Sequence, residues 1–289
     1  MKQTRRYALE AFHAALAALN PTDAVVRALR RTKARRVFVL GAGKAAMAMA
    51  VGAERALGDR IVAGWVNVPE GIKSACTRIH AHACGHPIPD RRGVLGSSRI
   101  LQLARSAQAG DLVVCLISGG ASALMPAPAM SLTLAKKQSV THLLLRRGAN
   151  IHELNTVRKH LSAIKGGHLA VAAYPAQVLS LVLSDVVGDD LHAIGSGPGV
   201  PDDSTWADAA AALERFGGDA HADTVTGVVR RGLAGEIADM KMPGREVRPG
   251  VWVGLNTRID WDNVDITGPV YVGSGTCIEP GVKIASHTA

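Results

Sequence analysis

The stretch Leu112-Val-Val-Cys-Leu-Ile-Ser-Gly-Gly-Ala-Ser122 decides the fold class. Its first six residues are all apolar, which is typical of a β-strand that is buried on both faces. Gly119 and Gly120 then end the strand, and helical spacing of apolar residues follows from about Leu132 to Arg147. A buried strand that leads through glycines into a helix is the repeating unit of α/β proteins.

The same unit recurs elsewhere in the chain. Apolar strands are predicted at Val37–Leu40, Ile61–Val68 and Val178–Leu183, and Lys44–Leu57 is predicted to be the helix after the first of them. The sequence therefore predicts an α/β fold with a mostly parallel sheet that helices cover on both faces. Because ligands of such sheets bind beyond the carboxyl ends of the strands, the polar motifs that follow these strands are candidate site residues.

The composition argues against several classes of function. Aromatic residues make up only 3% of the 289 residues, so nucleic-acid modules that stack bases on aromatic rings are not expected. No stretch is long enough to span a membrane. Cys76, Cys84, Cys115 and Cys277 lack metal-site spacing and fit a reducing cytoplasm. The net charge of +9 indicates either solvated helix ends or attraction of anionic metabolites.

The first motif, Gly41-Ala-Gly-Lys-Ala-Ala46, follows the first strand. Gly41 and Gly43 would let backbone N–H groups approach an anion, and Lys44 would add positive charge. The spacing is not that of a P-loop. It matches the loose dinucleotide pattern G-x-G-x-x-A, but no acidic residue closes the second strand, where Asn67 stands. The alternative to a phosphate or substrate site is a tight packing turn.

The second motif comprises Ser118, Gly119, Gly120 and Ser122 at the end of the strand quoted above. Small residues, two hydroxyls and an expected helix start predict a second anion cradle. The alternative is a simple turn between strand and helix. A nucleophilic serine elbow is not expected, because the pattern G-x-S-x-G is absent.

The third motif is a polar and cationic stretch. On a continuous helix Asn155, Arg158, Ser162 and Lys165 would lie roughly along one face, which leads into Gly166-Gly167. Such a stripe would suit a polyphosphate, because phosphoryl transfer depends mainly on positioning and charge neutralisation. A solvated helix face is the alternative.

The fourth motif places Asp185, Asp189 and Asp190 just after the strand Val178–Leu183. Carboxylates in this position can hold Mg²⁺ or accept the proton of a substrate hydroxyl. Aspartates also favour turns and helix caps, because they accept hydrogen bonds from their own backbone. Both interpretations stay open from the sequence.

The character of the chain changes after about residue 220. Apolar residues then recur at six-residue steps, first at Val253 and Ile259 and again at Val272, Ile278 and Ile284. Gly275 and Gly281 are also six residues apart. A hexapeptide period predicts a left-handed β-helix, in which each six residues form one side of a coil. The stretch is long enough for about two coils.

The four motifs together resemble the glycerate 2-kinases of the MOFRL type, in particular their N-terminal (DUF4147) domain, over residues 1 to about 217. The blocks that carry the resemblance are Gly41–Ala45, Gly85–Asp90, Leu116–Leu124, Asn155–Gly167, Leu183–Asp190 and Gly195–Thr205. Ala121 and Gly199 depart from the usual family residues, and neither removes a charged group.

This resemblance implies transfer of phosphate from ATP to the 2-hydroxyl of D-glycerate, giving 2-phosphoglycerate and ADP, with Mg²⁺. Lys44 would contact phosphoryl oxygens or the glycerate carboxylate, and Arg158 and Lys165 would neutralise the transferred charge. Asp185 or Asp189 would serve as base or metal ligand, the latter role shared with Asp190. The nucleotide-binding set that the resemblance implies is Gly41, Gly43, Ser118, Gly119, Gly120, Ser122 and Asn155.

The remainder resembles the β-helix tail of a sugar-1-phosphate nucleotidyltransferase. We therefore divide the chain into a kinase N-terminal α/β domain (1–217), a junction (218–250) and a truncated β-helix (251–289). The closing domain of the kinase family is not recognised, so we expect impaired turnover. The alternatives are a chain that only binds nucleotide or glycerate, a hydroxypyruvate reductase (a label that some family members carry), and a β-helix assembly protein that forms homo-oligomers.

Overall fold

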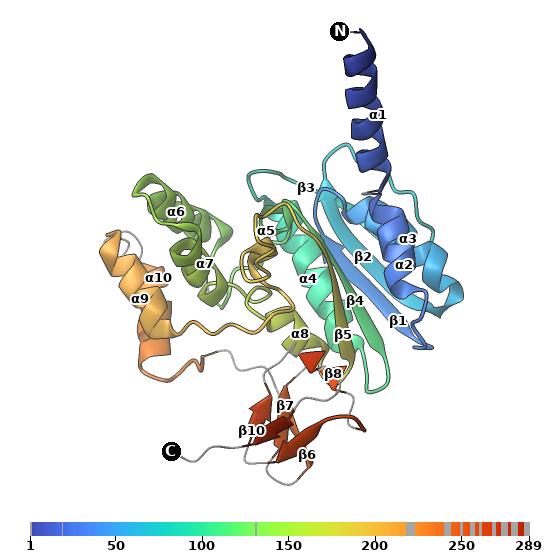
Figure 1. Cartoon of the computed structure of the whole chain (residues 1–289). Helices are drawn as coiled ribbons and strands as arrows, with labels where there is room; N and C mark the ends of the chain where they lie inside the picture. The colour runs from blue at the N-terminus through green and yellow to red at the C-terminus, as the bar shows by residue number, and fades with distance from the viewer. Residues whose placement is uncertain are drawn as a thin grey trace.

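The computed structural model describes most of the chain (Figure 1). The described residues are 2–18, 20–130, 132–217, 223–239, 244–248, 251–254, 258–259, 262–267, 270–272, 277–278 and 283–285. Gly275 and Gly281, two positions of the six-residue period, lie outside them.

A five-stranded parallel sheet forms the centre of the fold. Its strands are β1 (Val37–Ala42), β2 (Ile61–Pro69), β3 (Ile79–Cys84), β4 (Leu112–Ser118) and β5 (Gln177–Leu183). They lie in the order β3-β2-β1-β4-β5, and each neighbouring pair is parallel. The predicted parallel sheet is confirmed. The edge strand β3 is an addition, because His80 and His82 break up its apolar signal.

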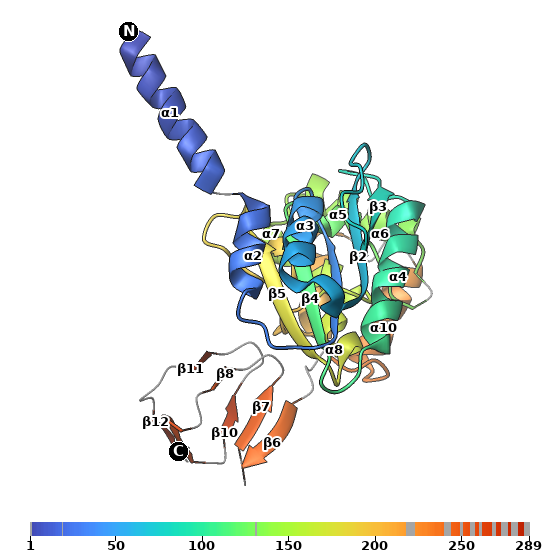
Figure 2. The same cartoon turned by 90° about the vertical axis from the view of Figure 1, so that its right-hand side faces the viewer.

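Helices cover both faces of this sheet (Figures 1 and 2). The covering helices are α2 (Pro21–Leu29), α3 (Ala46–Leu57), α4 (Arg91–Ser106), α5 (Ala121–Leu124) and α8 (His168–Ala173). Val37 and Val39 of β1 belong to the core under α2 and α3, whereas Phe38 and Leu40 belong to the core under α4, α5 and α8. Side chains alternate between the faces of a strand, so a strand covered on both sides must be apolar at successive positions.

Four further helices lie beside the sheet and enclose a core of their own (Figure 1). They are α6 (Leu134–Arg146), α7 (Ile151–His160), α9 (Trp206–Arg215) and α10 (Asp223–Leu233). Leu144, Leu154, Leu213 and Val225 are buried in this second core. α10 falls within the stretch 218–250 that the sequence predicts to be a junction, yet it packs here as a structural helix.

Local capping sets where two of these helices begin. The side chain of Asn150 accepts the backbone N–H of Glu153, and Glu153 in return accepts the N–H of Asn150, which forms a capping box at the start of α7. Thr205 and Asp208 do the same at the start of α9. The cap at Asn150 sets the start of α7, which contributes side chains to the site described below.

The first helix, α1 (Lys2–Ala18), extends away from the rest of the molecule in both views (Figures 1 and 2). Asn20 then caps α2 by accepting the backbone N–H of Thr22 at 2.9 Å. Two short 3-10 turns complete the helical elements, η1 (Gly58–Arg60) and η2 (Ile194–Ser196). Among the described residues, no helix combines the length and apolarity needed to cross a membrane.

The described residues from 244 onward include a series of short strands. They are β6 (Gly244–Arg248), β7 (Val251–Gly254), β8 (Arg258–Ile259), β9 (Asp265–Thr267), β10 (Val270–Val272), β11 (Cys277–Ile278) and β12 (Lys283–Ala285). β6 pairs antiparallel with β7, and the remaining pairs β7–β10, β8–β11 and β9–β12 are parallel.

The packing of α10 predicts a loss of stability that a linker would not show. Val225 is completely buried, so Val225→Ala should lower the free energy of unfolding by about 1–3 kcal/mol through lost apolar burial and a residual cavity. Val187→Ala, at a fully exposed position, is the matched control and should change it by less than about 0.5 kcal/mol. Equal midpoints and slopes in urea unfolding for both variants would contradict a structural role of α10.

Candidate active site

Three loops meet at the carboxyl edge of the sheet, where β1, β4 and β5 end. Lys44, after β1, donates its backbone N–H to the carbonyl oxygen of Gly119 at 2.9 Å. A Cβ atom on Gly119 would overlap the carboxylate of Asp185, so that carboxylate lies directly against the loop after β4. Parallel strands end at one edge, and this brings together motifs that are far apart in the sequence.

The loop after β1 is a packing turn as far as its backbone is concerned. The N–H groups of Gly43, Lys44 and Ala45 donate to Asn67, Gly119 and the hydroxyl of Ser118, respectively. Gly41 lies within β1 and pairs with β4. These N–H groups are therefore not available to an anion, which corrects the predicted cradle at Gly41 and Gly43.

Glycine is required at position 43 for two reasons. Its φ of 144° is in the region that side chains rarely adopt, and a Cβ atom would collide with Ser118. Ser118 is buried, and its hydroxyl accepts the N–H of Ala45 at 3.0 Å, at the start of α3. The structure thus uses Ser118 to join β4 to the loop after β1, and not as an open phosphate contact.

The side chain of Lys44 is open to solvent, whereas its backbone N–H is bonded within the protein. It is exposed, and its Cγ atom lies 3.4 Å from the place where a Cβ atom of Gly120 would be. The imidazole of His86 approaches the same point from the other side, at 2.8 Å. With a φ of 86°, Gly120 leaves room above the loop for both side chains. Lys44 and the loop Gly119–Ser122 are therefore neighbours, as the sequence predicts.

The predicted helical stripe is wrong. α7 ends at His160, so Ser162 and Lys165 lie beyond it and not on a common helix face with Asn155 and Arg158. Asn155 is buried and accepts the hydroxyl of Ser196 at 3.1 Å, and Ser162 donates to the carbonyl of Ala127. The cationic residues of this motif still converge, but through the tertiary fold.

Lys165 is the most deeply buried charged side chain of the site. Only 1% of it is exposed, and its ammonium donates to the carbonyl of Ser122 at 3.1 Å, the hydroxyl of Ser122 at 3.0 Å and the carbonyl of Gly195 at 3.1 Å. Burial lowers the pKa of Lys165 well below its ordinary value, and the nearby charges of Lys137 and Arg158 lower it further.

Lys137 on α6 is a member of the site that the sequence does not single out. Its buried ammonium donates to the carbonyl oxygens of Leu161 at 2.8 Å and Arg158 at 3.3 Å. Burial, followed by the positive charge of Arg158, lowers the pKa of Lys137 to about 7. A signal was present, since Lys137 precedes the buried Val140 and Leu144 by three and seven residues and so shares their helix face.

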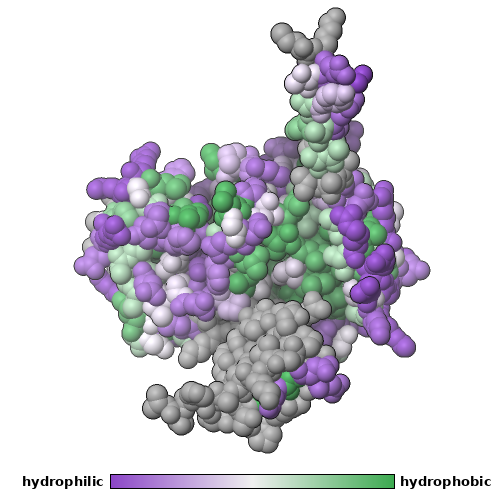
Figure 3. Space-filling model, viewed as in Figure 1, coloured by the Kyte–Doolittle hydropathy of each residue, from purple (hydrophilic) through white to green (hydrophobic). Residues whose placement is uncertain are grey.

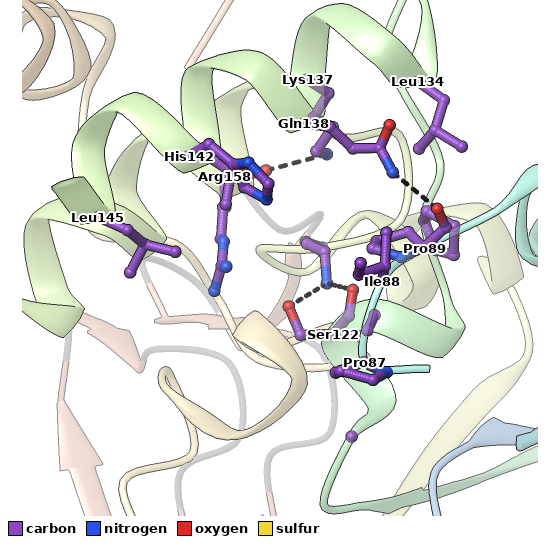
Figure 4. Close-up of a pocket in the computed structure, with 15 residues that line it drawn as sticks. Pro87, Ile88, Pro89, Ser122, Leu134, Lys137, Gln138, His142, Leu145 and Arg158 are labelled. Atoms are coloured by element: carbon purple, nitrogen blue, oxygen red, sulfur yellow. Dashed lines mark hydrogen bonds between the residues drawn. The ribbon is translucent and has the colours of Figure 1, made fainter. Parts of the chain in front are cut away.

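A cavity of about 380 Å³ opens above these cations (Figure 4). Arg158, Lys165 and Lys137 line it together with Gly120 and Ser122, and α6 and the segment Pro87–Pro89 form opposite walls. Among the described residues that line it there is no aspartate or glutamate. Burial also lowers the pKa of the Arg158 guanidinium. Such a cavity is built to receive an anion.

The acidic residues after β5 separate into two roles. Asp190 serves its own turn, because its side chain accepts the N–H of His192 at 2.9 Å, and its backbone carbonyl accepts those of Ala193 and Ile194. This favours the turn interpretation for Asp190 over a metal ligand. Asp185 and Asp189 are both exposed, and Asp185 lies against the loop after β4. No group of three or more metal-binding side chains occurs among the described residues.

The donor set nevertheless fits Mg²⁺ better than other metals. Mg²⁺ prefers oxygen ligands and is commonly held by one or two carboxylates together with substrate phosphates. Asp185, which lies against Gly119, provides a carboxylate of this kind, and Asp189 follows it four residues later in the chain. They are the residues that would hold the ion.

A dinucleotide site of the Rossmann type is disfavoured by Asn67. Asn67 stands near the end of β2, where a ribose-binding acid would be expected. It is completely buried, its amide nitrogen donates to Leu124 at 2.8 Å, and its side-chain oxygen accepts the indole N–H of Trp65 at 3.1 Å. Asn67 is therefore fully engaged inside the protein and out of reach of a ribose.

A family model described as "Domain of unknown function (DUF4147)" matches residues 7–230. The chain belongs to this family. The match includes all four motifs of the site and most of α10. The match confirms the family expected for the N-terminal part of the chain.

Proteins with known names are similar to this DUF4147 chain over much of its length. A human glycerate kinase is 42% identical over 238 residues, covering 73% of this chain and 46% of the relative. A D-glycerate 2-kinase of Thermotoga maritima is 40% identical over 214 residues, with coverages of 74% and 51%. A protein of Agrobacterium vitis that carries a hydroxypyruvate reductase name is 46% identical over 206 residues, with coverages of 71% and 47%.

The fold is also that of a solved glycerate kinase. The crystal structure of a Thermotoga maritima glycerate kinase superposes with a TM-score of 0.76 at 37% identity, and the match covers 79% of this DUF4147 chain and 55% of that structure. The chain spans about half the length of the relatives it matches.

The buried Lys137 predicts a specific pH dependence of stability. The unfolded chain keeps a proton on this lysine up to about its ordinary pKa of 10.5, whereas the folded chain releases it near pH 7. Stability should therefore rise with pH between about 7 and 10, by at most about 1.4 kcal/mol per pH unit from this group.

Lys137→Met keeps the apolar stem and should reduce this slope in urea unfolding between pH 7 and 9.5. The control is Lys73→Met, at an exposed position outside the site, which should keep the wild-type slope. A slope that is the same in wild type and Lys137→Met would show that Lys137 remains charged in the folded protein.

Proposed function

We propose that this chain is the phosphate-binding half of a D-glycerate 2-kinase and transfers the γ-phosphoryl group of ATP to the 2-hydroxyl of D-glycerate. The observation that carries this proposal is the convergence of Arg158, Lys165 and Lys137 on one cavity without an acidic partner among the lining residues. Three uncompensated cations at the carboxyl edge of a parallel sheet are the arrangement that a polyphosphate donor requires. The names of the related glycerate kinases supply the acceptor.

In this proposal the residues around Gly120 divide the reaction between them. Lys44 lies above the loop Gly119–Ser122 and would contact the transferred phosphoryl group or the carboxylate of glycerate. Arg158 and Lys165 stabilise negative charge on the phosphates, whose neutralisation is the main contribution of the protein to phosphoryl transfer. Gly119 and Gly120 carry no side chains of their own, which leaves room for Asp185 beside Gly119 and for Lys44 and His86 beside Gly120.

The carboxylates after β5 act on the acceptor. The 2-hydroxyl oxygen of glycerate attacks the γ-phosphorus, the bond to ADP breaks, and the hydroxyl proton passes to Asp185 or Asp189. Asp185 and Asp189 are the residues that would hold Mg²⁺, which would supply positive charge to the phosphoryl oxygens. Asp190 takes no part, because its side chain accepts a hydrogen bond within its own turn.

Two alternatives to this proposal are tested in different ways. A chain that binds nucleotide or glycerate without turnover would contain the same cavity, so only a reaction assay distinguishes it. The exposed positions of Asp185 and Asp189 are compatible with this alternative, since water exclusion commonly needs a closing element. A hydroxypyruvate reductase would need a dinucleotide site, and the buried Asn67 argues against one.

Kinase activity is tested with ATP, Mg²⁺ and D-glycerate by direct detection of 2-phosphoglycerate and of its 3-phospho isomer. We expect the 2-isomer, at a low rate. Lys44→Ala and Asp189→Asn should each lower kcat/KM by at least about 100-fold, because each removes a charge from the reacting groups. The matched controls Lys73→Ala and Asp203→Asn, at exposed positions, should keep wild-type values. Full activity in the first two variants would refute the assigned roles, and binding without any product would favour the non-catalytic alternative.

We also propose that residues 251–289 are a truncated β-helix of about two coils, whose outer strands pair with a second copy of the chain. Val251 pairs with Val270, Arg258 with Cys277 and Asp265 with Lys283, so the two partners of each pair are 18 or 19 residues apart in the chain. Three sides of six residues make a coil of about 18 residues, and offsets close to this number support the hexapeptide interpretation. In the described part, β10, β11 and β12 are outer strands, and outer strands are ready to pair.

Removal of residues 240–289 tests this assembly. The shortened chain retains α10 and its core, so it should unfold cooperatively and sediment as a monomer, whereas the full chain should sediment as a homo-oligomer. If the shortened chain keeps the oligomeric state of the full chain, or if the full chain sediments as a monomer, pairing through the tail is contradicted.

A further inference from the structure

The hydroxyl of Ser122 and the amine of Lys165 make a contact that has no role in the proposed phosphoryl transfer. Ser122 lines the cavity and is half-buried, so its hydroxyl is open to a small molecule that enters (Figure 4). Its Oγ atom lies 3.0 Å from the Nζ atom of Lys165, which lines the same cavity. A serine hydroxyl within hydrogen-bond distance of an amine has the geometry of a nucleophile and its base.

Two carbonyl groups fix the direction of the lone pair that Lys165 has when it is neutral. The carbonyl oxygens of Ser122 and Gly195 each lie 3.1 Å from Nζ. In the protonated form, the ammonium donates to both carbonyls and to the hydroxyl of Ser122. After loss of one proton, the two remaining N–H groups donate to the carbonyls, and the lone pair accepts the hydroxyl proton of Ser122. The same three contacts therefore suit a neutral amine that acts as a base.

The second hydroxyl near Ser122 does not compete with Lys165 for this proton. Ser196 is completely buried, and its hydroxyl donates to the side-chain oxygen of Asn155 at 3.1 Å. The Oγ atom of Ser196 lies 3.4 Å from that of Ser122, farther away than Nζ of Lys165. Since a hydroxyl has one proton to donate, that of Ser122 goes to the closer acceptor once the lone pair of Lys165 is free.

The surroundings of Lys165 favour the neutral amine. Burial lowers its pKa well below the ordinary value, and the positive charges of Lys137 on α6 and Arg158 on α7 lower it further. On the side of α8, the ring of His168 is bonded to the backbone carbonyl of Lys165 at 2.6 Å, and not to its amine. The described residues that line the cavity include no aspartate or glutamate to hold the proton in place. A fraction of the molecules therefore carries Lys165 as a neutral amine at neutral pH.

We propose that Ser122 and Lys165 are the nucleophile and the base of a second activity, the hydrolysis of small uncharged carboxylic esters. Serine and lysine form such pairs in other hydrolytic enzymes. The activity uses neither a nucleotide nor glycerate, and so it goes beyond the proposed kinase function. The sequence does not indicate it, because the pattern G-x-S-x-G is absent and the base lies 43 residues away from the nucleophile.

The reaction has two steps, and Lys165 carries the proton in both. The Oγ atom of Ser122 attacks the carbonyl carbon of the ester while its proton passes to Nζ of Lys165. The bond from this carbon to the alkoxy oxygen breaks, the leaving alcohol takes the proton from Lys165, and the acyl group stays on Ser122. Water then attacks the acyl carbon and gives a proton to Lys165, the bond to Oγ breaks, and Oγ takes that proton back. Arg158, which lines the same cavity, would stabilise the negative carbonyl oxygen.

The walls of the cavity favour an ester with apolar groups. Apolar and cationic side chains are interspersed around it, and Figure 4 places Arg158 between Leu145 and Ile88. Leu145 is 52% exposed and Ile88 is 64% exposed, so both can gain burial against a ligand. Figure 3 likewise shows green, apolar residues among purple, polar ones over the helices beside the sheet, where α6 lies in Figure 1. A volume of about 380 Å³ accommodates a small acyl group together with its leaving group.

An anion in the cavity would stop this second activity. A negative charge close to Lys165 favours the protonated amine and raises its pKa. The protonated amine has no lone pair and cannot accept the proton of Ser122. Binding of phosphate and hydrolysis of an ester therefore exclude each other, which is why the ester is expected to be uncharged.

The proposal is tested on the full chain with p-nitrophenyl acetate as substrate and with phenylmethylsulfonyl fluoride as a covalent probe. We expect hydrolysis of the ester, and labelling of Ser122 that peptide mapping by mass spectrometry locates. Ser122→Ala and Lys165→Met should each lower both rates by at least about 100-fold, because they remove the nucleophile and its base. Ser98→Ala, at an exposed position on α4 outside the cavity, is the matched control and should keep the wild-type rates.

Three further measurements separate a base from a merely structural lysine. Lys165→Arg keeps a cation that does not lose its proton, so it should be as slow as Lys165→Met. After subtraction of the rate of Ser122→Ala, the wild-type rate should rise with pH through an ionisation below the ordinary lysine value of 10.5. Pyrophosphate should inhibit both reactions of the wild type. The pH profile and the inhibition need no substitution of Lys165, so they decide its role even if circular dichroism shows that its variants do not fold.

The opposite results overturn the proposal. Equal rates in wild type and Ser122→Ala, or a wild-type chain that neither reacts with the probe nor hydrolyses the ester, would show that Ser122 is not a nucleophile. Folded Lys165 variants that react as fast as wild type, or rates that pyrophosphate leaves unchanged, would show that Lys165 is not its base. The kinase assay is independent of these results, because none of them involves ATP or D-glycerate.

Discussion

The buried ammonium of Lys165 is the interaction on which the architecture of the site depends. Removing a cation from water costs several kcal/mol unless its protons find acceptors, and here the carbonyls of Ser122 and Gly195 and one hydroxyl accept them. These acceptors come from the loop after β4 and from η2. The N–H groups of Gly166 and Gly167 reinforce the link by donating to Ser196 and Gly197. A single side chain thus joins two distant segments into the floor of one cavity.

This arrangement sacrifices stability for binding. Burial lowers the pKa of Lys137, Arg158 and Lys165, and nearby positive charges lower the pKa of the two lysines further. Strongly perturbed groups in a cleft are a mark of functional sites, since an ordinary core would replace them with apolar residues. An anionic ligand relieves the repulsion, so the same three charges that weaken the empty protein favour its complex.

The sequence predicts some elements of this protein much better than others. Four strands of the sheet are recognisable because both faces are covered, which makes their apolar runs continuous, whereas β3 at the edge is not. The helical spacing of Asn155 to Lys165 fails as a predictor, because spacing assumes that the helix continues and α7 ends at His160. The sequence does not single out Lys137 for another reason. A lysine on a helix is expected to face solvent, and only the packing of α6 over the loop after α7 buries it.

The sequence by itself determines the parallel sheet, its two helical layers and the presence of polar motifs at the strand ends. Periodicity and glycine positions are local properties, and local properties are what a sequence displays. The tertiary structure alone decides which groups are open to a ligand. The N–H groups after β1 are consumed by Asn67, Gly119 and Ser118, while three cations from α6, α7 and the loop after α7 remain without an acid. Hydrogen bonds and charges are satisfied by partners far away in the chain, and therefore their balance is known only once the chain has folded.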